Sequence, residues 1–351
     1  MVMSVLTISS TREQMLESLT YRRTYNGETI APMDTDAVAE RISEKRSPTS
    51  SIGELQILPL ELLYLLFELS DLQAPVHLRL TCRRARMLVD ASPSYRCLRI
   101  HTPHVICILL RVGIASHFTV SYIAELLHSD SRCSRCGRFG SFLYIPECVR
   151  CCYSCMRFHR STVPMTKADS MAAFGLTART IATLPVMTTV PGTYGGGLRA
   201  ERSRPIQLLS PALARAAAEL QHGGKEYLVA YIEGKGTQAK RKYDKRVTSR
   251  LALLALNPPE YDQDGNLAGP DWDDVKRYMA AMPFPYLDPS LGDIHDGMSC
   301  KGCRHALDNC SSSSRAEIYH RVYRAYTVDG FFEHYVVCKE AQHLWKSLGD
   351  L

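Results

Sequence analysis

The stretch from residue 58 to residue 89 carries more leucine than three short helices can bury among themselves. Its apolar residues recur at i, i+4, i+7, i+8 and i+11, which places them on one helix face: Leu58, Leu62, Leu65, Leu66 and Leu69. Pro59 suits the first position of this helix, Pro75 can open a second helix, and Thr81 can start a third. Such an excess of apolar side chains is typical of a module that packs against a partner.

Two motifs stand out in this stretch: Leu58-Pro59-x-Glu61-Leu62-Leu63 and Leu80-Thr81-Cys82-Arg83-Arg84. Over residues 55–90 the pattern resembles an F-box, the helical module that docks on the Skp-type adaptor of SCF ubiquitin ligases. The resemblance implies adaptor contacts from these residues: Leu58, Pro59, Leu62, Leu65, Leu66, Leu69, Leu72 and Leu80. Ser70 and Ala85 stand where many F-boxes have leucine and tryptophan, which reduces the apolar contact area. Periodicity alone favours a plain three-helix part of a larger core.

The chain shows no sign of a membrane span or an export signal. Arg111 interrupts its most apolar segment, and no run of about eighteen apolar residues exists. The first residues lack the order of a basic and then an apolar segment, with Glu13 and Glu17 placed early. We therefore expect a cytoplasmic or nuclear protein, or one found in both places.

Ten of the thirteen cysteines are gathered in two clusters. Six lie between Cys133 and Cys155, and four lie between Cys300 and Cys338. Because thiols stay reduced inside cells, this clustering favours structural zinc sites over disulfides. A zinc bound by four thiolates and one bound by three thiolates and a histidine would together halve the formal charge of +6, which leaves little argument for nucleic acid.

The first cluster holds three Cys-x2-Cys pairs, of which two can close a tetrahedral zinc site around a short hairpin. We favour Cys133, Cys136, Cys152 and Cys155, with Cys148 and Cys151 as alternates. The segment Phe142–Ile145 would be the strand between the pairs. The alternative is six small buried hydrophobic residues.

The second cluster combines Cys300 and Cys303 with His334 and Cys338. His334 and Cys338 are spaced to share one face of a helix that Asp329 can cap and that continues to Leu348, with Val337 in its packing stripe. A further helix is expected within residues 315–327. His305 and Cys310 are alternate ligands, and the alternative to a metal site is a core histidine beside a buried thiol.

The resemblance widens to a group of filamentous-fungal F-box proteins over roughly residues 55–351. It rests on these further motifs: Leu143-x-x-Pro146-x-Cys148-x-Arg150-x-Cys152-x-x-Cys155, Leu184-Pro185-x-Met187, Pro191-Gly192-x-Tyr194, Pro283-Phe284-Pro285-Tyr286-Leu287 and Phe332-x-His334-x-x-x-Cys338-x-x-Ala341. The resemblance implies architecture and adaptor binding, and little about the target.

The expected fold is mainly α with minor β: a three-helix F-box, then a helical domain with small zinc-ribbon or knuckle hairpins. We divide the chain as follows: 1–52 disordered; 53–92 F-box; 93–200 a helical pair with the first cysteine cluster; 201–351 a helical region with the second. Tyr95–Ile100 is expected to be extended. Helices are expected in these segments: 104–115, 119–129, the turn after Thr166 up to Gly175, 211–222, and Trp272–Met282.

These observations predict a non-catalytic substrate receptor of an SCF-type ubiquitin ligase, with the adaptor, the cullin complex and an unknown protein target as partners. The competing hypothesis is a zinc-containing nucleic-acid-binding or scaffold protein without a ligase role. Its motivation is the basic run at residues 240–246, which is more typical of a solvated loop or a localisation signal. No phosphate-binding loop, Gly-x-Ser-x-Gly or His-Glu-x-x-His motif suggests an enzyme.

Overall fold

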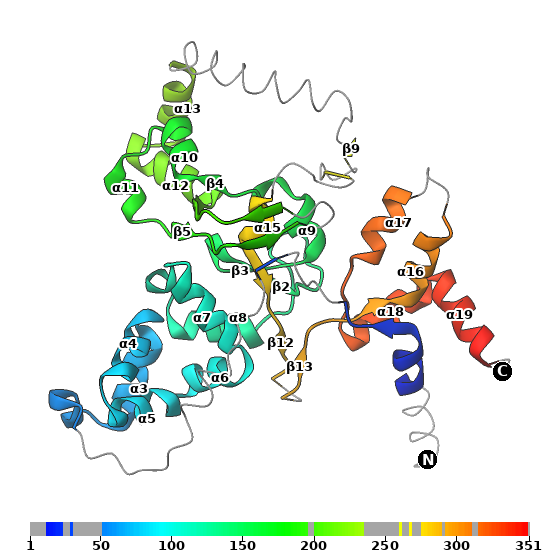
Figure 1. The fold of residues 1–351 in the computed structure, drawn as a ribbon, viewed down its shortest axis with the longest axis horizontal. Coiled ribbons are helices and arrows are strands. Elements are labelled where there is room, and N and C mark those ends of the chain that lie inside the picture. The colour runs from blue at the N-terminus through cyan, green and yellow to red at the C-terminus, as the bar shows by residue number, and fades with distance from the viewer. Residues whose placement is uncertain are drawn as a thin grey trace.

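The computed structural model describes these residues: 12–23, 29–30, 51–195, 200–234, 260–261, 267–268, 275–289, 292–310 and 315–349. The fold is mainly helical with small antiparallel sheets, as the sequence predicts (Figure 1). In the described part of the chain, no helix is both long and apolar enough to cross a lipid bilayer.

The three helices expected near the N-terminus are all present: α3 (Leu60–Leu69), α4 (Gln73–Thr81) and α5 (Arg83–Ala91), after the short 3-10 turn η2 (Gly53–Ile57). Cys82 begins α5, because its sulfur accepts the N–H of Ala85. Leu63 and Phe67 on α3 are buried, together with Val89 on α5. The first helix therefore turns one apolar face inward and leaves its other leucines outside.

Three further helices continue the bundle: α6 (Pro93–His101), α7 (Pro103–Arg111) and α8 (Val120–His128), with the 3-10 turn η3 (Ala115–His117) before α8. The helices expected at residues 104–115 and 119–129 are thus confirmed. The extended segment expected at Tyr95–Ile100 is wrong, since these residues lie in α6. Pro93 starts that helix, and Tyr95 and Leu98 bury one face three residues apart.

One buried apolar cluster extends from Leu63 on α3 through Ile123 on α8 to Met282 further along the chain. The residues before and after position 92 therefore share a single core. Leu72 belongs to this core, fully buried, and its N–H donates to the carbonyl of Phe118. It contributes nothing to an exposed surface, which corrects its place among the expected adaptor contacts.

A three-stranded antiparallel sheet lies at the centre of the molecule. Its order is β11 (Ala281–Pro283), β2 (Phe142–Tyr144) and β3 (Val149–Cys151), with the turn η4 (Ile145–Glu147) joining the last two and helix α9 (Tyr153–Phe158) following. The strand expected around Phe142–Ile145 is confirmed. Of the helix expected at Trp272–Met282, the described residues show α15 (Lys276–Met279), whereas Ala281 and Met282 form a strand that pairs with Tyr144 and Leu143.

A second layer covers the central sheet on the side seen at the top of Figure 1. Its elements are η5 (Arg160–Thr162), β4 (Met165–Thr166), α10 (Lys167–Phe174), α11 (Ala178–Ala182), β5 (Met187–Thr188), β6 (Gly192–Tyr194), β7 (Ala200–Arg202), β8 (Gln207–Leu209), α12 (Pro211–His222) and α13 (Lys225–Gly234). Thr166 caps α10 and Gly175 ends it at φ +65°, as expected. The helix expected at 211–222 is confirmed as α12.

The C-terminal residues form a separate group of helices, at the right of Figure 1. The isolated pair β9 (Glu260–Tyr261) and β10 (Leu267–Ala268) and the hairpin of β12 (Tyr286–Leu287) and β13 (Ile294–His295) precede this group, and the hairpin lies near the centre of Figure 1. The elements of the group are β14 (Ser299–Cys300), α16 (Lys301–Asp308), α17 (Arg315–Val322), α18 (Val328–Val337) and α19 (Lys339–Gly349). The helix expected within 315–327 is α17. A small second core joins Cys303, Phe331 and Ala341.

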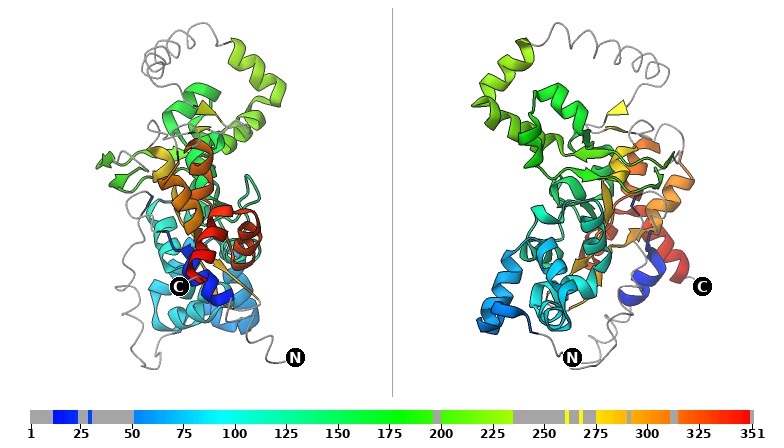
Figure 2. Two further views of the ribbon diagram at one scale, coloured as in Figure 1. Left: turned by 90° about the vertical axis from the view of Figure 1, so that its right-hand side faces the viewer. Right: turned by 60° about the vertical axis from the view of Figure 1, so that its left-hand side comes forward.

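Part of the N-terminal segment completes this C-terminal group. Residues 12–19 are helical, and the strand β1 (Thr20–Tyr21) pairs with β14. Leu19 is fully buried in the small core, and Lys301 donates to the last carbonyls of the helix. The disorder expected for residues 1–52 is therefore wrong for residues 12–23. Figure 2 shows this first helix beside the last helices of the chain.

A buried arginine joins the parts around the central sheet. Arg150 on β3 is 3% exposed and donates four hydrogen bonds to backbone carbonyl oxygens. The acceptors lie in three segments: Gly140 at 2.7 Å, Leu126 at 2.8 Å, Phe284 at 3.1 Å and Pro285 at 2.8 Å. Burial lowers the pKa of Arg150 to about 10, so the guanidinium still carries its charge at neutral pH.

We expect Arg150→Met to destabilise the protein by about 3–5 kcal/mol, because several buried carbonyls lose their donors at once. The control is Arg84→Met, which changes an exposed arginine and should cost less than about 0.5 kcal/mol. Chemical denaturation of both variants measures the difference. Equal stability of the two variants would contradict this role of Arg150.

Candidate metal centres

The first cysteine cluster begins in a tight turn. Arg132 and Phe139 form an isolated antiparallel bridge that closes this turn. Gly137 has φ +70° and its N–H donates to the carbonyl of Cys133, so the chain curls behind Cys133 and Cys136. A left-handed residue at this point lets the sulfurs of two cysteines three positions apart face the same side.

The other half of the cluster lies at the start of helix α9. Cys152 is the first cap residue, and its sulfur accepts the N–H of Cys155 at 3.4 Å. The sulfur of Cys133 likewise accepts the N–H of Arg135 at 3.4 Å. Unpaired N–H groups at a helix start stabilise negative charge, so this position favours the thiolate that a metal needs.

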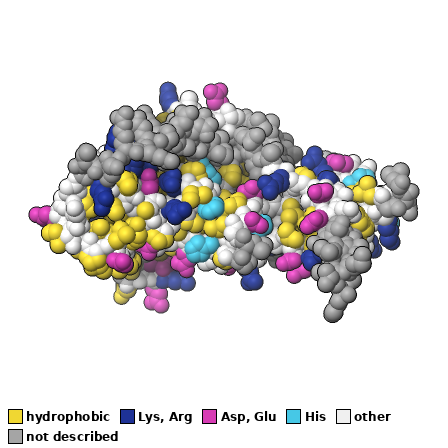
Figure 3. Space-filling view, turned by 90° about the horizontal axis from the view of Figure 1, so that it is seen from below, with side chains coloured by type: hydrophobic (Ala, Val, Ile, Leu, Met, Phe, Trp, Pro, Cys, Tyr) yellow, Lys and Arg dark blue, Asp and Glu magenta, His cyan; other side chains and the backbone are white. Residues whose placement is uncertain are grey.

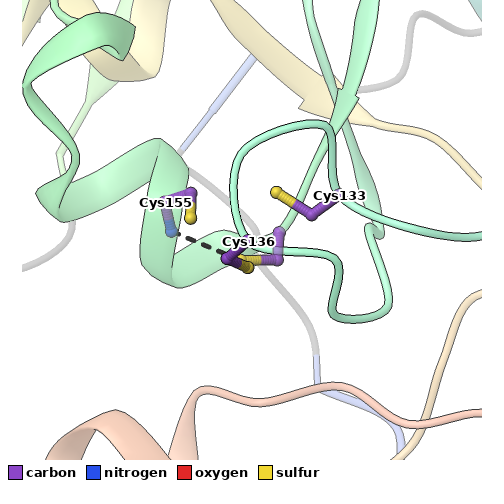
Figure 4. A group of neighbouring side chains, drawn as sticks. Cys133, Cys136 and Cys155 are labelled. Carbon is purple, nitrogen blue, oxygen red and sulfur yellow. Dashed lines mark hydrogen bonds between the residues drawn. The ribbon is translucent and has the colours of Figure 1, made fainter. Parts of the chain in front are cut away.

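The four sulfurs of Cys133, Cys136, Cys152 and Cys155 lie within 4.8 Å of one another. The sulfurs of Cys136 and Cys152 are 3.6 Å apart. A tetrahedral zinc with Zn–S bonds of about 2.3 Å requires sulfurs roughly 3.8 Å apart, so the arrangement fits one ion. Figure 4 shows Cys133 and Cys136 on the turn facing Cys155 on the helix. Cys136 is exposed and the other three are buried.

The two alternate cysteines lie outside this group. Cys148 is fully buried at φ +50°, and burial raises the pKa of its thiol. Cys151 is also buried, and its thiol donates to the carbonyl of Cys152 at 3.4 Å. The structure thus brings together the four cysteines that the sequence favoured and leaves the other two in the core.

The second cluster also begins with a cysteine that caps the start of a helix. Cys300 is the cap residue of α16, and its sulfur accepts the N–H of Cys303 at 3.5 Å. The sulfur of Cys303 lies 3.3 Å from Nε2 of His334 and 3.8 Å from the sulfur of Cys338. The sulfurs of Cys300 and Cys338 are 4.0 Å apart. All four residues are buried, and their ligand atoms lie within 4.8 Å of one another.

Helix α18, which carries His334, ends just before Cys338, the last residue of the second cluster. Cys338 is extended (φ −94°, ψ 94°) between α18 and α19, although its N–H still donates to the carbonyl of His334. The single long helix of the sequence analysis is therefore wrong, and Val337 is 73% exposed instead of packed. The cap residue of α18 is Thr327, whose hydroxyl accepts the N–H of Gly330.

The alternate ligands of the second cluster point elsewhere. His305 is exposed and forms a hydrogen bond with Asn309. The thiol of Cys310 donates to the carbonyl of Leu307. Close packing also shapes this cluster, because a Cβ on Gly302 would come within 2.4 Å of the backbone N of Ala341.

Two neighbours of the second cluster were not expected from the sequence. Thr20 pairs directly with Cys300, so the N-terminal strand braces a ligand. Arg321 places a nitrogen 3.8 Å from the sulfur of Cys338 and 3.2 Å from the carboxylate of Glu340. This guanidinium lies where it offsets thiolate charge. The apolar spacing of residues 15, 16 and 19 was the available signal for the first of these contacts.

The leucines of helix α3 form a second candidate site, which we call the leucine face. Its members on α3 are Leu60 (44% exposed), Leu62 (50%), Leu65 (49%), Leu66 (46%) and Leu69 (65%). Leu80 on α4 is exposed near the end of its helix, Pro59 is exposed, and Leu58 is half-buried against the core. Figure 3 shows hydrophobic side chains gathered at the left end of the molecule, where these helices lie.

Comparisons of the chain with protein-family models, with curated proteins and with solved structures give no match. The basic run at 240–246 lies outside the described residues.

We expect the purified protein to carry two zinc ions per chain, one in each group. Cys136→Ser and Cys303→Ser should each lose one ion, because each removes a ligand from a different group. Cys310→Ser is the control and should keep both ions. Elemental analysis of the purified variants measures the metal. A wild-type content well below one ion per chain would rule out both sites.

We also expect a chelator to remove the two ions in two phases. The first cluster has the exposed ligand Cys136, whereas all four ligands of the second are buried. The fast phase should therefore be absent from Cys136→Ser, and the slow phase should be absent from Cys303→Ser. Release followed with a colorimetric zinc dye distinguishes these cases. A fast phase that persists in Cys136→Ser would contradict the assignment.

Proposed function

We propose that this protein is the substrate-receptor subunit of an SCF-type ubiquitin ligase. The observation that carries the proposal is that helix α3 is apolar on two faces. Leu63 and Phe67 hold the helix to the core, so the leucine face is not needed for folding. The motifs at residues 58–63 and 80–84 support an F-box that places this face on a Skp-type adaptor.

The size of the leucine face suits a docking surface that needs further contacts. Burying the exposed half of a leucine contributes roughly 1 kcal/mol, so the five leucines of α3 supply roughly 5 kcal/mol. Association costs roughly 4–15 kcal/mol in lost freedom and ordering. The interface must therefore extend beyond α3, and the exposed Ile57 and Leu80 flank the helix on the same module.

We further propose that both metal centres hold zinc in a structural role. Thiolate and imidazole ligands are those that zinc prefers, and four protein ligands fill its tetrahedral shell. A catalytic zinc keeps one position for water or substrate, which neither group leaves free. The metal then braces the residues that follow the F-box, with binding energy that becomes folding energy.

In this role the receptor performs no bond chemistry. One end binds the adaptor, and the remainder holds a target, so the target's lysines meet the ubiquitin-charged partner at a raised effective concentration. The shared core between α3 and the central sheet supports this role, because it fixes the distance between the two binding regions.

We expect Leu62→Asp with Leu66→Asp to weaken binding to a purified Skp-type adaptor by at least about a hundred-fold, because two carboxylates would be buried in an apolar contact. The control is Leu220→Asp on α12, an exposed leucine far from α3, which should bind like wild type. Surface plasmon resonance measures both affinities, and thermal unfolding checks that each variant is folded. Equal binding by the two variants would refute the proposal.

A further inference from the structure

A cavity of about 640 Å³ lies between the two metal centres and belongs to neither of them nor to the leucine face. Cys152 of the first cluster and His334 of the second both line it. Its volume falls in the range of sites that bind small ligands or short peptide segments. A cavity framed by both clusters has walls that the proposed metals would hold in place.

The two sides of this cavity are joined by packed aromatic rings. Tyr153 on α9 stacks on Tyr323, with ring centres 4.8 Å apart and planes inclined by 10°. The guanidinium of Arg23 lies 3.9 Å from the centre of the Tyr323 ring. Phe139 of the first cluster approaches Gly297 so closely that a Cβ there would come within 2.6 Å of the ring. These contacts make the cavity a formed site.

Three polar groups on residues that line the cavity lack hydrogen-bond partners within the described chain. They are the hydroxyl of Ser154, the hydroxyl of Tyr326 and Nε of Arg324. Ser154 is only 9% exposed, so water reaches it poorly. Buried polar groups are rarely left unpaired, and all three of these groups can donate. The three atoms have almost no accessible surface, so a ligand pairs with them only if neighbouring side chains move.

The charges around the cavity favour an anionic ligand. Arg132, Arg138 and Arg324 line it, and none of them has an ion-pair partner among the described residues. Two acidic residues, Asp329 and Glu333, also line the cavity, and Asp329 forms an ion pair with Arg12. Arg321 contacts Cys338 and offsets thiolate charge of the second cluster. Cys152 brings thiolate charge of the first cluster to one wall of the cavity, and the guanidinium groups of the three arginines remain able to bind a carboxylate.

We propose that this cavity binds an acidic peptide segment of the target protein, an assignment that rests on the receptor role proposed above. The peptide's carboxylates pair with Arg138 and Arg324. Val336 and Val337, exposed at the end of α18, give the mouth an apolar edge, and Val337 lines the cavity itself. Apolar contacts beside a charged pair are the usual composition of a peptide-binding site.

The test uses three fluorescein-labelled octapeptides with the full-length, zinc-loaded protein. One alternates glutamate with alanine, one lysine with alanine, and one serine with alanine, so that no leucine can compete for the leucine face. Fluorescence polarisation should show the acidic peptide binding at least ten-fold more tightly than the other two. Its affinity should fall as salt is raised, because ion pairs near the surface are screened.

Variants of the cavity locate the site. Arg138→Glu with Arg324→Glu should weaken the binding of the acidic peptide at least ten-fold. The matched control is Arg202→Glu with Arg204→Glu, which reverses two exposed arginines outside the cavity and should leave the affinity unchanged. Zinc content and thermal unfolding confirm that each variant is folded.

Two results would overturn the inference: equal affinity for all three peptides, or equal loss in the cavity and control variants. The adaptor measurement reports on the receptor role separately. The Arg138/Arg324 variant should bind the Skp-type adaptor like wild type, because the cavity is remote from the leucine face. Loss of the acidic peptide with adaptor binding kept would therefore support the cavity as the target site.

Discussion

The fold depends on one buried cation that has no carboxylate partner. Arg150 sits between the alternate cysteine Cys148 and the ligand Cys152, and it satisfies carbonyls from the end of α8, from the turn after Cys136 and from the segment after β11. Backbone carbonyls in irregular segments need donors when they are buried. One guanidinium supplies several of them, which lets non-repetitive chain pack against the central sheet and holds the turn of the first metal centre.

The two metal centres share the same local backbone arrangement despite their different surroundings. In each, a Cys-x2-Cys pair begins a helix, so that the first sulfur caps the helix and accepts an N–H from the second cysteine. The helix start thereby meets its own need for an acceptor while it favours thiolate over thiol. The small core around Cys303 holds few buried apolar residues, and a group of that size gains most from an added cross-link.

Sequence reasoning succeeded where the signal was local. The helices α3, α8 and α12 are predicted by apolar spacing and start residues. The favoured cysteines are predicted by the spacing of two Cys-x2-Cys pairs. It failed where a contact with a segment far away in the sequence determines the local structure. The spacing of Leu72 matches the exposed leucines. In the structure, however, its N–H donates to the carbonyl of Phe118 and its side chain is buried in the core. The strand at Ala281 looked helical because its partner β2 lies far away in the chain. The ending of α18 at Cys338, where the backbone is extended, has no local signal such as a glycine or proline in the sequence.

The pairing of Thr20 with Cys300 has a consequence for how the chain is made. The ribosome synthesises the N-terminal helix first, but its partners emerge only about three hundred residues later. At roughly 5–20 residues per second, this delay is on the order of tens of seconds. Throughout that interval Leu19 and its apolar neighbours have no surface to cover them. Closure of the second metal centre is thus a late event of biosynthesis, which waits until residues 300–338 have been synthesised.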